Sequence, residues 1–230
     1  MKMHTMIKTG LLVLLIFACG RMSAQSADNI AMEYLRTVGD QTTIYYGSLQ
    51  LGRPQTVNHP YLVAEQYTAA RLSFRGVVYP EVRLRLDLER DKLIILSPNG
   101  SNIVLVSKDL DYAVLHGRHI VYLDNDVLPT GHYTVLHSGN TTVLKRQTAI
   151  LTYRQVPPSG MERRFMFRTT FYLYKDGVYH MVRNQRGLLR ILYPHQRALR
   201  QFISANNLNY RRHTEELITR TIIEYEKLSK

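Results

Sequence analysis

The sequence predicts a mainly β, α+β protein in which an antiparallel sandwich or barrel-like β body is followed by C-terminal helices. Two observations support this fold class. Between residues 71 and 150, apolar and polar residues alternate in short runs separated by turn residues, as half-buried strands require. After residue 183 the apolar spacing becomes helical, and no helical segment separates the earlier strands, so a parallel sheet is excluded. With 230 residues, 45% of them hydrophobic, the chain can bury such a core.

The run from 81 to 88 shows the strand pattern most clearly. Val82, Leu84 and Leu86 alternate with charged residues, which places them on one buried face. Six further short strands are expected, separated by turn residues, at 93–96, 103–106, 112–115, 120–123, 133–136 and 142–150. Short strands at this regular spacing are typical of antiparallel sandwiches and barrels.

Two turn motifs follow. Pro157-Pro158-Ser159-Gly160 is either an exposed loop or the seam between two modules. Asp176-Gly177, between alternating apolar segments, predicts a tight hairpin turn, so the sheet continues beyond the prolines.

The chain then changes to helical spacing. Short helices are expected at 187–192 and 195–205, and a last helix begins at Thr214. The predicted organisation is a signal peptide at 1–24, an antiparallel β body at 25–183, and a basic helical segment at 184–230 that packs on the body.

The N-terminus has the pattern of a secretory signal. Lys2 and Lys8 precede an apolar run at 11–18 that is too short for a comfortable membrane span, and cleavage is expected after Ala24. We therefore expect an exported protein, in the periplasm or associated with the outer membrane. A second interpretation stays open, in which Cys19 becomes a lipid-carrying first residue. Either way, no cysteine remains in the folded part to form an internal disulfide.

Positive charge is concentrated in the last third of the chain. The net charge is +12, and residues 145–230 hold 17 basic and 6 acidic residues. Seven arginines and no acid lie between Gly177 and Thr214, and the candidate binding residues among them are Arg186, Arg190, Arg197 and Arg200. Such a surface attracts lipid headgroups, lipopolysaccharide phosphates or an acidic protein. Nucleic acid is not an expected partner of an exported chain. The alternative is a solvated basic face without a ligand.

Tyrosine is the second candidate for binding. The chain has 16 tyrosines and no tryptophan. Tyr172, Tyr174 and Tyr179 are expected on one face of the predicted hairpin, beside the arginines. The alternative is ordinary sheet packing with hydroxyls that reach water.

Histidines offer a weak alternative for metal binding. If Gly117-Arg118 forms a two-residue turn, His116 and His119 become opposite neighbours on one face. Two ligands are too few for a closed zinc site. We therefore assign no metal, cofactor or catalytic residue.

Short motifs of turn residues and core aromatics occur along the chain, among them Tyr45-Tyr46-Gly47, His59-Pro60-Tyr61-Leu62 and the segments 76–82, 86–93, 131–139 and 172–179. In these motifs the chain resembles an uncharacterised group of exported proteins of Bacteroidetes bacteria. It departs from the usual pattern at Leu86, where the group has Tyr, and in a tail richer in Arg than in Lys. The resemblance implies an envelope location and a β-rich fold with a basic helical tail, and no active site.

Two functional hypotheses follow from these features. The first is a non-enzymatic cell-envelope accessory or adaptor protein that binds an outer-membrane or periplasmic protein complex or an anionic surface. The alternative is a hydrolase or metal-dependent enzyme that uses histidines of the central sheet. An enzyme requires polar groups that converge in a deep pocket, whereas an adaptor requires an apolar patch with a polar rim.

Overall fold

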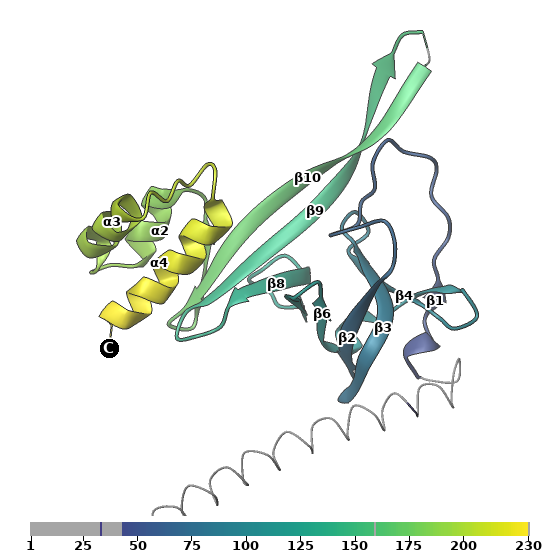
Figure 1. The fold of residues 1–230 in the computed structure, drawn as a ribbon, viewed down its shortest axis with the longest axis horizontal. Coiled ribbons are helices and arrows are strands. Elements are labelled where there is room, and N and C mark those ends of the chain that lie inside the picture. The colour runs from purple at the N-terminus through teal and green to yellow at the C-terminus, as the bar shows by residue number, and fades with distance from the viewer. Residues whose placement is uncertain (1–32, 34–42, 159, 230) are drawn as a thin grey trace, which may run out of the picture.

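The computed structural model describes residue 33, residues 43–158 and residues 160–229. The expected signal peptide at 1–24, with Cys19, lies outside the described residues. Figure 1 shows one twisted sheet, a layer of three helices on the C-terminal strands, and a long hairpin that extends away from both.

The strands are β1 (Ser48–Leu49), β2 (Thr68–Phe74), β3 (Val77–Asp87), β4 (Lys92–Leu96), β5 (Asn102–Val104), β6 (Leu110–Leu115), β7 (Arg118–Leu123), β8 (Gly131–His137), β9 (Thr142–Val156), β10 (Gly160–Lys175) and β11 (Val178–Val182). They form a single sheet in the order β1-β5-β4-β3-β2-β6-β7-β8-β9-β10-β11, and every neighbouring pair is antiparallel. The mainly β, antiparallel prediction is confirmed, and the sheet is open.

The helices are α2 (Gln185–Ile191), α3 (Gln196–Ala205) and α4 (Thr214–Leu228), with short 3-10 turns η2 (Thr43–Tyr45) and η3 (Ser107–Asp109). The three α-helices expected from the spacing are confirmed. Asn184 caps α2, because its side-chain oxygen accepts a hydrogen bond of 2.8 Å from the Gly187 N–H.

A first hydrophobic core is enclosed by the curvature of the sheet. Its side chains come from alternate positions of β2 to β7, and the long strands add Ala149 and Phe165. Residues 50–62, here called the strap, run along this core. The Val57 N–H donates to the Arg163 carbonyl (2.9 Å), and the Asn58 side chain exchanges two hydrogen bonds with the backbone of Phe165 (3.0 and 2.7 Å). The strap therefore connects the first strands to β10.

A second core lies between the helices and the C-terminal strands. Phe171, Leu173 and Val182 of the sheet pack against helical side chains that recur at helical spacing, including Leu188, Leu199, Leu217, Ile218 and Ile222. Polar contacts also fasten α4 to the sheet. Lys145 Nζ donates to Glu215 Oε2 at 2.5 Å, and His137 Nε2 lies 3.0 Å from Glu226 Oε2.

A smaller third cluster occupies the opposite face of the same strands. It comprises Leu128, Tyr133, Leu144 and Tyr172. Because successive residues of a strand point to opposite faces, Phe171 and Leu173 contact the helices while Tyr172 faces away from them. Among the described residues, one face of the C-terminal strands is thus covered by helices and the other is covered by none.

The paired prolines lie at the tip of the long hairpin. Pro157-Pro158 follow β9, and β10 begins at Gly160, so the segment is an exposed loop within one hairpin and the alternative of a seam between modules is wrong. Both strands are also longer than the expected short runs. Residues 152–158 and 160–164 form the protruding end of this hairpin, and the strap contacts its base through the hydrogen bond between Val57 and Arg163; we call these residues the arm (Figure 1).

Candidate functional site

The predicted tyrosine hairpin is present. Asp176 and Gly177 form the two-residue turn between β10 and β11, with φ of 50° and 78°. Tyr174 lies directly opposite Tyr179, with ring centroids 4.6 Å apart. Tyr172 is on the same face but is only 5% exposed, because it packs edge-on against Tyr133 at 5.9 Å. Tyr172 is therefore buried beneath the hairpin face, and Tyr174 and Tyr179 lie at the protein surface.

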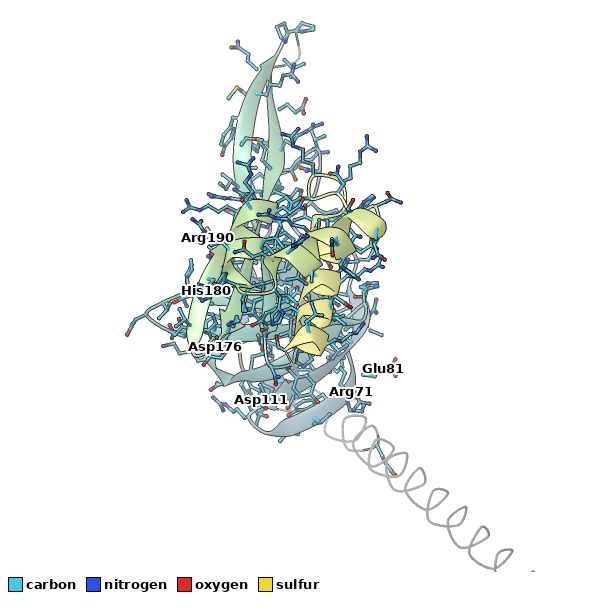
Figure 2. The ribbon with its side chains drawn as sticks, turned by 90° about the vertical axis from the view of Figure 1, so that its left-hand side faces the viewer. Arg71, Glu81, Asp111, Asp176, His180 and Arg190 are labelled. Carbon is cyan, nitrogen blue, oxygen red and sulfur yellow. The ribbon has the colours of Figure 1, made fainter. Side chains whose placement is uncertain are left out.

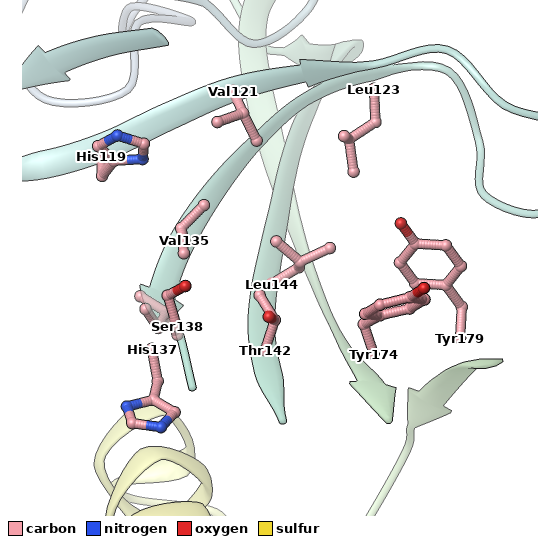
Figure 3. A pocket seen from close by; sticks show the side chains of 11 residues that line it. His119, Val121, Leu123, Val135, His137, Ser138, Thr142, Leu144, Tyr174 and Tyr179 are labelled. Carbon is pink, nitrogen blue, oxygen red and sulfur yellow. The ribbon is translucent and has the colours of Figure 1, made fainter. Parts of the chain in front are cut away.

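A pocket of about 570 Å³ opens beside these tyrosines (Figure 3). Five of its eleven lining residues are aliphatic side chains of β7, β8 and β9, namely Val121, Leu123, Val135, Leu136 and Leu144. Tyr174 and Tyr179 stand together at one side, and polar side chains complete the lining: His119, His137, Ser138 and Thr142. The volume falls in the range of small-ligand pockets, and the lining can hold an apolar or ring-shaped group with hydroxyls at its edge.

The two histidines of this pocket are held by other contacts. The ring of His119 stacks on Tyr112 at 5.2 Å between centroids. The ring of His137 points toward α4, where its Nε2 meets Glu226, and the same carboxylate accepts a 2.8 Å hydrogen bond from the Thr141 N–H. These contacts give both rings a structural role.

His116 and His119 are not cross-strand neighbours, so the register contradicts the weak alternative of a metal pair there. The turn consists of His116 and Gly117, with φ of 49° and 71°, one residue earlier than expected. The first pair after it is Leu115 with Arg118, and His119 lies opposite Val114. Within the part of the chain that the structure describes, no group of three or more His, Cys, Asp or Glu residues is arranged to hold a metal ion.

A buried histidine–carboxylate contact links β8 to the turn after β3. His132 Nδ1 donates to Asp91 Oδ1 at 2.7 Å, and the His132 backbone N–H donates to the same oxygen at 3.1 Å. Burial alone raises the pKa of Asp91, but the hydrogen bonds and charge of His132, with the charge of Arg146, lower the pKa below its ordinary value. A Cβ at Gly131 would lie 2.0 Å from Asp91 Oδ2, so only glycine permits this approach. The His132 side chain is fully buried and out of reach of a substrate, so the contact is structural.

The four predicted arginines lie on two neighbouring helices. Arg186 and Arg190 are on α2, Arg197 and Arg200 are on α3, and all four are exposed. Among residues 43–158 and 160–229, no carboxylate forms an ion pair with any of them. Figure 2, in which Arg190 is labelled, shows the helical layer that presents this charge toward the viewer.

A cleft of about 710 Å³ brings two of these arginines together with a third. Arg186 and Arg200 line it with Arg211, which the list of candidate residues omitted, and with Leu189 and Tyr210. Arg190 and Arg197 do not line it. In the sequence, Arg211 belongs to the arginine run that contains no acid. Only the fold shows that it lies near Arg186. We call this group of side chains the arginine cleft.

The tyrosine pocket and the arginine cleft do not form one surface. The cleft lies on the helices, which cover the sheet face of Phe171 and Leu173, whereas Tyr174 and Tyr179 lie on the other face. The sequence places the tyrosine hairpin beside the arginines, whereas in the structure the two groups lie on opposite sides of the C-terminal strands. The molecule has two separate candidate surfaces.

Comparisons with protein-family models, with curated proteins and with solved structures give no match for this chain. In the described residues, no helix is long and apolar enough to cross a membrane. The two surfaces are therefore the basis for a functional proposal.

Proposed function

We propose that the protein is a non-enzymatic accessory or adaptor protein of the cell envelope, which docks onto an anionic partner through the exposed arginines of α2 and α3. The observation that carries the proposal is the exposure of these side chains without ion-pair partners in the described chain. Folding gains nothing from keeping like charges close together, whereas a counter-charged partner relieves their repulsion.

The residue type favours phosphate or carboxylate as the partner's anionic group. A guanidinium presents a planar fork of donors that matches both groups and forms two parallel hydrogen bonds. In the arginine cleft, Arg186, Arg200 and Arg211 surround Leu189 and Tyr210. A phosphorylated headgroup, a lipopolysaccharide phosphate, or an acidic segment of an outer-membrane protein complex meets these requirements. Because we expect an exported chain, nucleic acid is not part of the proposal.

The tyrosine pocket supports an adaptor with two contacts. It lies on the sheet face opposite α2, α3 and α4, so a bound partner there leaves the arginine cleft accessible. Tyr174 and Tyr179 supply aromatic area with few rotatable bonds, which favours contact with a protein side chain. One molecule can therefore hold an apolar group and an anionic group at the same time.

The enzyme hypothesis lacks a comparable observation. His119 and His137 are engaged in a ring stack and an ion-pair contact, and His132 is fully buried. The other lining residues of the pocket that His119 and His137 border are five aliphatic residues, two tyrosines, Ser138 and Thr142. We therefore do not propose a hydrolase or metal-dependent activity.

The proposal is tested by association with the isolated envelope fraction at low salt. The variant Arg186→Glu/Arg200→Glu is compared with Arg83→Glu/Lys92→Glu, which changes the net charge equally at exposed positions outside the helices. We expect the first variant to lose association and the second to retain it. If both variants associate as the unmodified protein does, the arginines are only a solvated basic face and the proposal fails.

A further inference from the structure

Two exposed apolar side chains, Tyr153 and Met161, lie on one face of the arm. Tyr153 pairs with Arg163, and Met161 pairs with Gln155, so these four side chains share one face of the ribbon. Met161 is 64% exposed and Tyr153 is 59% exposed. Pro157 and Pro158 at the tip are exposed as well. The arm therefore ends in apolar groups that the body does not cover.

The other face of the arm is charged. Arg154 pairs with Glu162, and Thr152 pairs with Arg164. Arg164 Nε lies 3.5 Å from Glu162 Oε1, while Arg154 and Arg163 form no ion pair with any residue that the structure describes. With three arginines and one glutamate the arm is positively charged, and Arg163 brings this charge to the face of Met161 and Tyr153 as well.

Stability of the fold does not explain these side chains. A two-stranded ribbon is only marginally stable in water without a third strand or a packed face. Figures 1 and 2 show that the arm extends beyond the sheet and the helices, so its distal part gains nothing from packing on the body. An external surface that covers them explains the exposed Met161 near the tip and the exposed Tyr153 nearer the base.

We propose that the arm inserts its tip into the headgroup region of an anionic lipid bilayer. From the Thr152–Arg164 pair to the tip there are four residue steps, or about 13 Å. Interfacial elements enter a bilayer by about 5–10 Å, so Met161 and the prolines reach the acyl boundary while the three arginines stay among the phosphates. Tyrosine is favoured at this depth because its ring is apolar and its hydroxyl is polar.

The positive charge of the arm favours an anionic bilayer over a second copy of the chain as the surface that covers it. Two arms with the same excess of arginine repel each other, whereas anionic headgroups attract them. This inference does not depend on the arginine cleft, which lies on the helices. Its success or failure is therefore separable from that of the proposed function.

The absence of tryptophan from the sequence permits a direct test. Met161→Trp places a single tryptophan on the arm, and Val127→Trp places one at an equally exposed position (69%) between β7 and β8. Each full-length variant is mixed with phosphatidylglycerol vesicles whose acyl chains are brominated near the headgroup. We expect the emission of the Met161→Trp variant to shift to shorter wavelength and to be quenched, and that of the Val127→Trp variant to remain unchanged.

Three further measurements test whether anionic lipid and the arginines of the arm cause the emission shift and the quenching. Neutral phosphatidylcholine vesicles should give neither shift nor quenching. Adding Arg154→Glu and Arg163→Glu to the Met161→Trp variant should abolish the quenching, while adding the four substitutions Arg186→Glu, Arg190→Glu, Arg197→Glu and Arg200→Glu should leave it in place at saturating lipid. An unquenched tryptophan at position 161 in vesicle-bound protein, or a shift that requires an acidic protein in place of lipid, would overturn the inference.

Discussion

Tyr174 and Tyr179 face each other across the β10–β11 hairpin, with ring centroids 4.6 Å apart, and the Lys175–Val178 pair separates them from the turn at Asp176-Gly177. Their tilted rings form one wall of the apolar pocket, and Tyr174 is 40% exposed. The same pair thus connects hairpin stability with the shape of a binding surface.

A double-mutant cycle on this pair should show favourable coupling. Tyr174→Ala and Tyr179→Ala each remove one ring, and the pair should be worth about 0.5–1.5 kcal/mol beyond the area each ring buries. The free energies of unfolding of the single and double variants, measured in urea, give the coupling. Additive single effects would show that the rings do not stabilise each other.

Acid should destabilise the protein partly through Asp91. Its pKa is lower in the folded state than in the unfolded chain, because the hydrogen bonds from His132 and the charge of Arg146 outweigh the effect of burial. Its stabilising contribution is therefore complete above the unfolded pKa of about 4 and is lost as pH falls through the lower folded value. Urea unfolding at a series of pH values from about 6 to 2.5 measures the decline.

Asp91→Asn is the control for this prediction. It removes the titrating carboxylate, so the variant should be less stable at neutral pH by about 1–3 kcal/mol and should lose less stability on acidification. If the free energy of unfolding fell equally with pH in the Asp91→Asn variant and in the unmodified protein, other carboxylates would be responsible for the acid sensitivity.

Two substitutions in the turn between β6 and β7 should change the free energy of unfolding in opposite directions. His116 and Gly117 both have positive φ, as the central residues of a type I′ turn do. Gly117→Ala has open space for its Cβ but should cost about 1 kcal/mol, because an L residue is strained at this φ. His116→Asn should raise the free energy of unfolding, because asparagine tolerates the conformation better. If Gly117→Ala raised the free energy of unfolding, the assignment of a type I′ turn would be wrong.

Envelope association should depend on salt. Binding through the arginines of α2 and α3 should weaken as ionic strength exceeds about 0.15 M, where the Debye length falls to about 8 Å. Reversing the charge of Arg186, Arg190, Arg197 and Arg200 should abolish association and leave the thermal midpoint nearly unchanged, because all four side chains are exposed. Co-sedimentation and thermal unfolding of the same preparations separate these two effects. Association that is insensitive to salt would point to an apolar contact.

Local patterns predicted much of the fold. The alternation at Val82, Leu84 and Leu86 correctly indicated one buried face of β3, because that period follows from strand geometry alone. Asp176-Gly177 fixed the hairpin register that sets Tyr174 opposite Tyr179. Both features depend on residues close in sequence.

Features that depend on distant residues could not be predicted. At residues 116–118, either His-Gly or Gly-Arg could form a two-residue turn, and only the observed register decides that His119 pairs with Val114. The tyrosine pocket combines β7, β8, β9, β10 and β11, whose order in the sheet is a tertiary property. Helical spacing likewise predicted that Arg186 and Arg200 lie on helices, but it could not predict that Arg211 lies beside them.

The long strands β9 and β10 contribute side chains to all three hydrophobic clusters: Ala149 and Phe165 to the first, Val143, Phe171 and Leu173 to the second, and Leu144 and Tyr172 to the third. Loss of this pair would expose the β body and the helical layer together. The two parts therefore share one structural element, and the amide hydrogens of β9 and β10 beneath these clusters should be among the slowest to exchange.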